Sequence, residues 1–124
     1  MLASSNQRTV YFAKIECAAA VEDVEQIAAI EGVDGLWLGH YDLSASLGAP
    51  GQFDSRPFTQ AVDRIIAACQ LHNLSLGRIV SSVAEGRALY EVGFDFLAYS
   101  GDAWILRDSL AKAILAMREN CAGS

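Results

Sequence analysis

The chain has 124 residues, of which 52% are hydrophobic and 19% are charged, and its formal net charge at pH 7 is −6. This length allows one domain at most, and the hydrophobic share excludes a disordered chain. The chain lacks the long apolar run of a transmembrane helix, and its acidic balance argues against nucleic acid or an anionic membrane as the main partner. We therefore expect residues 1–124 to form a single domain.

The three cysteines, Cys17, Cys69 and Cys121, are widely spaced. An odd number at this spacing fits no disulfide framework, and no Cys-x-x-Cys pair is present for zinc. The polar stretch over residues 1–9 lacks the apolar core of a signal peptide. We therefore expect reduced, buried thiols in a cytoplasmic protein.

The first part of the chain predicts a strand, a helix and a second strand. Val10–Ile15 and Val33–Leu38 are short runs rich in β-branched and aromatic residues, which is typical of strands. Between them, apolar residues three apart predict a helix over Ala19–Ile30. The glycine-containing connection His40–Ser55 predicts a loop, with a short helical turn at Leu43–Leu47. Connections of this length are often functional.

The second unit ends with a helix that starts near Asp54 or Ser55 and faces inward through five residues: Phe58, Val62, Ile65, Ile66 and Cys69. Leu74–Val80 is the next predicted strand. Ser82 followed by Glu85 is a capping box that opens a helix over Val83–Val92.

The last unit predicts a strand over Phe94–Tyr99 and a long helix that Asp102 can cap. Five apolar residues at helical spacing would form the buried stripe of that helix: Ile105, Leu106, Leu110, Ile114 and Met117. The order is β-α four times without hairpin signals, which implies parallel strands joined by right-handed crossovers. A small open sheet and half of a TIM (β/α)8 barrel both satisfy this order, since a complete barrel needs roughly 250 residues.

Two acidic residues lie at the ends of the first two strands. Glu16 ends the first strand, and Asp42 lies three residues after Gly39, which closes the second. Neighbouring strand ends lie about 5 Å apart, so two carboxylates there repel each other unless they are protonated or bridged by a cation. Oxygen ligands suit magnesium or manganese better than zinc. The residues alone leave two other interpretations open, because Asp42 can cap the following turn and Glu16 can pair with Lys14.

Three segments carry a more specific pattern: IE at Ile15–Glu16, VDGLWLGHYDLSASLG at Val33–Gly48 and PGQFD at Pro50–Asp54. Together they resemble the HpcH/HpaI family of metal-dependent pyruvate aldolases, which includes 4-hydroxy-2-oxoheptanedioate and 2-dehydro-3-deoxyglucarate aldolases. The similarity continues through Gly77 and AEGRALYEVGFDFLAYSGD, so it covers nearly the whole chain. It implies the C-terminal half of a TIM barrel, with four consecutive βα units and without the N-terminal half.

The resemblance also implies a site and a reaction. Glu16 and Asp42 would hold Mg²⁺ or Mn²⁺, and Co²⁺ is a third candidate. The backbone of Gly39, Tyr41 and Asp42 would bind the carboxylate of the pyruvate unit, and Lys14 would contact the substrate. The expected reaction is that of a class II aldolase, a lyase that cleaves a 4-hydroxy-2-oxo acid to pyruvate and an aldehyde while the ion takes up the enolate charge.

The sequence departs from the family pattern in two respects. Lys14 stands where the family usually has glutamine, and it can reach an anionic substrate or pair with Glu16 and weaken the metal site. The general-base histidine and the substrate-binding arginine belong to the absent half, so we expect no catalytic residue here and no turnover by this chain alone. A non-catalytic assembly or interaction module is the alternative function. Family members are symmetric oligomers whose last helix packs on a neighbouring subunit, which implies a homo-oligomer.

Three further polar residues have simpler interpretations. His40 would line the substrate channel, and His72 would lie on the surface at a helix end. Arg78 could point into the mouth of the site, but a pairing with Asp95 or Asp102 is favoured.

Overall fold

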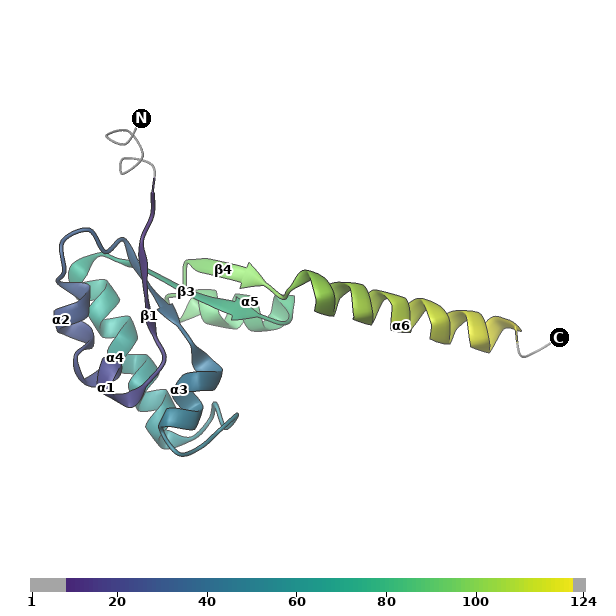
Figure 1. The fold of residues 1–124 in the computed structure, drawn as a ribbon, viewed down its shortest axis with the longest axis horizontal. Helices are drawn as coiled ribbons and strands as arrows, with labels where there is room; N and C mark the ends of the chain where they lie inside the picture. Colours follow the sequence, from purple (N-terminus) through teal and green to yellow (C-terminus); the bar gives the residue numbers. More distant parts are fainter. Residues whose placement is uncertain (1–8, 122–124) are drawn as a thin grey trace.

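The computed structural model describes residues 9–121, which form four successive strand–helix units (Figure 1). The strands pair in parallel in the order β1-β2-β3-β4. They are β1 (Phe12–Ile15), β2 (Gly35–Leu38), β3 (Ser75–Val80) and β4 (Phe96–Tyr99). Because parallel neighbours require a crossover, each pair is joined through helices. This confirms the predicted alternation and the predicted parallel sheet.

The helices follow the strands in order, two after β1, two after β2 and one after each of the others. They are α1 (Ala18–Glu22), α2 (Val24–Ala28), α3 (His40–Ser46), α4 (Arg56–His72), α5 (Val83–Glu91) and α6 (Asp102–Cys121).

The single helix predicted over Ala19–Ile30 is wrong, because α1 and α2 are separated at Asp23, whose φ is −96° and ψ is 8°. Arg64 of α4 explains the break. Its Nη2 donates to the carbonyl of Glu22 at 2.8 Å, which is the acceptor that the amide of Gln26 would use in a continuous helix. The periodicity was correct for Val21 and Val24, which are buried, but Ile30 at the end of the pattern is 57% exposed. The pattern also contained no signal for the Arg64 contact.

The connection after β2 is helical from its first residue, whereas the sequence predicts helix only over Leu43–Leu47. Leu43 is fully buried, and its amide donates to the carbonyl of Gly39 at 2.8 Å. Ser44 fixes the far end, since its hydroxyl donates to the carbonyl of Tyr41 and accepts from the amide of Gly51. These bonds fix the first turns of α3 and tie the helix to the loop that follows it.

The core lies between the sheet and helices α1, α2 and α4, which cover one face of it (Figure 1). Fully buried side chains come from both layers, among them Ile15, Val24, Leu36, Leu38, Ile65 and Leu76. Alternate residues of each strand supply this layer, as the period of two requires.

The opposite face of the sheet carries three aromatic side chains from three strands. Phe12 stacks on Phe96 with ring centroids 4.9 Å apart, and Trp37 meets Phe96 edge-on. Gly77 makes room for them, because a Cβ there would lie 2.8 Å from Cε3 of Trp37. Phe96 remains half exposed. This is the face that turns inward when such strands close into a barrel.

Helix α6 projects away from the sheet, and each of its residues is exposed (Figure 1). The prediction of a buried stripe on this helix is therefore wrong within the chain, although the stripe exists, with Leu110 53% and Ile114 44% exposed. Among residues 9–121, no helix has the length and apolar character needed to cross a membrane.

The cysteine prediction is correct for one residue of three. Cys69 is buried in the core, and burial, followed by the charge of Asp95, raises the pKa of its thiol to about 11. Cys17, the N-cap of α1, and Cys121, the last residue of α6, are exposed.

Candidate functional site

The two predicted metal ligands meet at the carboxyl ends of β1 and β2. The amide of Gly39 donates to the carbonyl of Ile15 at 2.9 Å, which joins the ends of these strands. Between the two carboxylates lies the ammonium of Lys14, 2.5 Å from Oε2 of Glu16 and 3.5 Å from Oδ2 of Asp42. The two carboxylates therefore point toward one cation.

Gly39 permits this approach. A Cβ at this position would lie 2.8 Å from Cβ of Glu16 and 2.9 Å from Cε of Lys14. Any other residue would push the β2 end away from β1, since real Cβ atoms do not come so close. Gly39 thus serves the site through its small size.

The charges of this cluster explain why the ammonium lies there. The hydrogen bond to Glu16 raises the pKa of Lys14; burial opposes the effect, and the charges of Glu16 and Asp42 add to it. Two neighbouring carboxylates need a positive partner, because like charges disfavour joint ionisation. The same donor set suits a hard divalent ion, which takes carboxylate oxygens. Within residues 9–121, no group of three or more His, Cys, Asp or Glu side chains is placed to hold a metal.

The backbone groups expected to bind a pyruvate carboxylate differ in availability. The N–H of Gly39 is used by the carbonyl of Ile15, so it is engaged in the sheet. Tyr41 and Asp42 lie in the first turn of α3, where amides precede any intrahelical acceptor. Their N–H groups are therefore the better donors of the predicted set.

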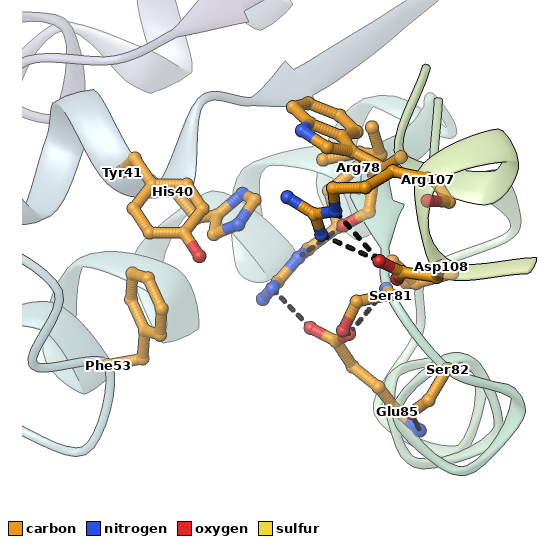
Figure 2. Close-up of a pocket in the computed structure, with 13 residues that line it drawn as sticks. His40, Tyr41, Phe53, Arg78, Ser81, Ser82, Glu85, Arg107 and Asp108 are labelled. Atoms are coloured by element: carbon orange, nitrogen blue, oxygen red, sulfur yellow. Dashed lines mark hydrogen bonds and ion pairs between the residues drawn. The ribbon is translucent and has the colours of Figure 1, made fainter. Parts of the chain in front are cut away.

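Beside this cluster lies a cavity of about 560 Å³ at the carboxyl ends of β3 and β4 (Figure 2). Residues from α3, β3, α5, α6 and the segments that connect the elements line it, and they are His40, Tyr41, Phe53, Arg78, Ile79, Val80, Ser81, Ser82, Glu85, Ser100, Trp104, Arg107 and Asp108. Helix α3 therefore contributes to both places: Asp42 contacts Lys14, whereas His40 and Tyr41 line the cavity.

The buried charge in this cavity is Arg78, whose side chain is only 8% exposed. Its Nη2 lies 2.7 Å from Oε1 of Glu85, so the predicted partners Asp95 and Asp102 are wrong. Asp95 instead accepts from the amide of Leu76. Arg78 points toward the helix side of the strand, where Glu85 at the start of α5 is the nearest carboxylate (Figure 2).

Glu85 also closes the capping box, in a variant form. Its amide donates to Oγ of Ser82 at 3.1 Å, as predicted, but its carboxylate accepts from the amide and hydroxyl of Ser81 instead of returning to the Ser82 amide. Burial alone would raise the pKa of Glu85, but the Ser81 hydrogen bonds and the charge of Arg78 lower it overall. The carboxylate is therefore ionised at neutral pH.

Replacing Glu85 with glutamine should lower the free energy of unfolding at pH 7 by about 2 kcal/mol, because it weakens charged hydrogen bonds and leaves Arg78 buried. Since the pKa of Glu85 is below its usual value near 4.3, this contribution is present above that value and disappears as the pH falls through the lowered pKa. Urea unfolding between pH 6 and pH 3 measures the difference in unfolding free energy between the variant and the unmodified chain. This difference should shrink as the pH falls. Glu91→Gln on the exposed side of α5 is the control, and an equal effect of both variants would refute the prediction.

His40 lies against aromatic rings and not in open solvent. It is 6% exposed, and its ring centroid lies 4.5 Å from that of Tyr41 and 5.1 Å from that of Phe53. Burial and the charge of Arg78 lower its pKa, so the imidazole is neutral at pH 7. His40 thus lines the cavity as a neutral ring.

Sequence reasoning missed the pairing of Arg78 with Glu85. One signal was present, since an arginine within the apolar strand LSLGRIV demands a buried partner. Which residue is that partner depends on which face of β3 packs on helices, and this requires the register of β3.

The sequence is similar to those of known aldolases. Residues 2–108 match the model of the HpcH/HpaI aldolase/citrate lyase family. The chain belongs to this family. A 5-keto-4-deoxy-D-glucarate aldolase of Klebsiella pneumoniae is 32% identical over 117 residues, which are 94% of this chain and 46% of that protein. A 4-hydroxy-4-methyl-2-oxoglutarate aldolase of Chaetomium globosum is 40% identical over 77 residues, 62% of this chain and 28% of that protein.

HpcH/HpaI family structures also share the fold. A family protein from Burkholderia cenocepacia has a TM-score of 0.86 and 32% identity, over 94% of this chain and 46% of its own. An aldolase from Desulfitobacterium hafniense has a TM-score of 0.84 and 28% identity, over 95% of this chain and 46% of its own. The chain thus spans about half the length of these barrel-type proteins, which confirms the half-barrel prediction.

Proposed function

We propose that this chain supplies the metal- and pyruvate-binding half of a class II aldolase that cleaves a 4-hydroxy-2-oxo acid to pyruvate and an aldehyde. The observation that carries the proposal is the convergence of Glu16 and Asp42 on one cation at the carboxyl ends of two paired strands. The aldolase relatives are named for 5-keto-4-deoxy-D-glucarate and 4-hydroxy-4-methyl-2-oxoglutarate, and both names support a small oxo-acid substrate. We further propose that residues 1–124 form one partial barrel domain of a cytoplasmic enzyme.

The proposed roles follow from what each group offers. Glu16 and Asp42 would hold Mg²⁺, Mn²⁺ or Co²⁺, and a bound divalent ion would supply Lewis-acid stabilisation for the negative charge that develops as the C–C bond breaks. The amides of Tyr41 and Asp42 would orient the carboxylate of the 2-oxo acid. Lys14 would contact the anionic substrate. The general base and the substrate-binding arginine would come from outside these residues, so this chain alone should show no turnover.

A retro-aldol assay coupled to pyruvate detection tests this function. The chain is assayed alone and fused to the upstream portion of the Klebsiella pneumoniae relative, each with and without EDTA. We expect turnover only in the fusion and only without EDTA. Turnover that survives EDTA would refute the metal-dependent reaction, and an inactive fusion that folds would favour the alternative.

The alternative is a non-catalytic assembly module, and the exposure of α6 favours it. A helix of 20 residues that leaves its whole apolar stripe in water is a surface that associates. This role is compatible with a metal-binding loop that performs no catalysis.

In either case we propose a homo-oligomer formed through α6. Leu110→Lys should shift the chain from oligomer to monomer, because it places a charge in the middle of the stripe formed by Ile105, Leu106, Leu110, Ile114 and Met117. Ala111→Lys adds the same charge one turn after Arg107 and Asp108, away from the stripe, and should leave the oligomer intact. Sedimentation velocity measures both variants, and a monomeric unmodified chain would contradict the proposal.

A further inference from the structure

We propose that Lys14 is a built-in counter-ion of the Glu16–Asp42 pair, so that a divalent cation binds only by displacing its ammonium. The inference rests on the proposed function, because it concerns the same two carboxylates. What it adds is that the Lys14 ammonium competes with the ion and takes up a second position when the ion binds. It also predicts that the chain binds the ion more weakly than the two carboxylates alone would.

The geometry places the ammonium at the point where the carboxylates converge. Nζ of Lys14 contacts Glu16 at 2.5 Å and Asp42 at 3.5 Å, so one positive charge serves both acids. A metal ligated by these oxygens needs their lone pairs, and a dication so close to an ammonium is repelled. The ion and the ammonium are therefore alternatives at this position.

The backbone keeps Lys14 near the site in both states. Lys14 pairs with Trp37 in the register of β1 and β2, and its side chain passes Gly39, whose missing Cβ leaves the passage. Side chains of Lys14, Glu16 and Asp42 are 49%, 45% and 65% exposed, so the ammonium can move into solvent without breaking the core. Once displaced, it stays tethered beside the ion and is positioned to contact an anion that the ion carries.

Lys14→Gln tests the competition, with Lys112→Gln as the matched control. These are the two lysines of the chain, and Lys112 lies on α6, so both variants remove the same net charge. Mn²⁺ binding to the 124-residue chain is measured from the loss of the free-ion EPR signal. We expect Lys14→Gln to bind Mn²⁺ about tenfold more tightly than the unmodified chain, as repulsion at a few ångströms implies. Lys112→Gln should bind like the unmodified chain.

A second readout follows the ammonium itself. Chains labelled with ¹³C at lysine Cε give one resonance for each lysine, and the two variants assign them. Added Mg²⁺ should shift the Lys14 resonance and leave that of Lys112 in place. If Mg²⁺ binds and the Lys14 resonance does not move, the displacement is refuted.

Glu16→Gln in the Lys14→Gln background separates this inference from the proposed function. We expect it to weaken Mn²⁺ binding strongly. If it does, and Lys14→Gln nevertheless binds no better than Lys112→Gln, the counter-ion role is overturned while the metal site stands. If Mn²⁺ binding does not depend on Glu16, or none occurs at millimolar ion, both the site and the counter-ion role are overturned.

Discussion

Asp42→Ala should reduce metal-dependent turnover of the fused barrel at least about a thousandfold. Asp42 is one of two carboxylates that converge on the cation position, and the Lewis-acid contribution of a bound ion amounts to several kcal/mol, with a tenfold loss for each 1.4 kcal/mol. The rate of pyruvate release at saturating Mn²⁺ measures the effect. The residual rate should no longer respond to EDTA.

Asp63→Ala is the control for this experiment. Asp63 is an exposed aspartate on α4, so the variant makes the same chemical change at a position far from the strand ends. It should retain the turnover of the parent fusion. An Asp42→Ala enzyme that keeps its rate and its EDTA response would remove Asp42 from the metal site.

Ile65→Ala should destabilise the chain by about 2–5 kcal/mol, because it opens a cavity at a fully buried position of α4. Ile65 lies in the single core that joins α1, α2 and α4 to the sheet. A change of this size lowers the melting temperature by on the order of 10 °C or more in a domain of this length. Thermal unfolding followed by circular dichroism measures the shift.

Ile30→Ala removes the same atoms from a side chain that is 57% exposed. Its expected effect on the melting temperature is small, since surface substitutions usually change stability by less than about 0.5 kcal/mol. Equal shifts for the two variants would show that α4 does not form the core described above.

Helix and strand periods predicted the element order well, because an apolar period reports which residues must leave water. The limits appear where a tertiary contact replaces a local bond. Arg64 binds the carbonyl of Glu22 and divides a predicted helix, and nothing in the residues around Glu22 signals that. Helix α3 also begins earlier than predicted, at His40, where the amide of Leu43 donates to the carbonyl of Gly39 and the Leu43 side chain is buried in the core.

By itself, the sequence determined the four βα units, their parallel order and the candidates Glu16 and Asp42, because strand ends and their acidic residues are local features. Only the tertiary structure decided that Lys14 lies between those carboxylates and that Arg78 pairs with Glu85. It also decided that the apolar stripe of α6 meets solvent. The physical reason is the same in each case. A period or a charge states what a side chain requires, whereas its actual partner depends on which distant residues the fold brings within a few ångströms.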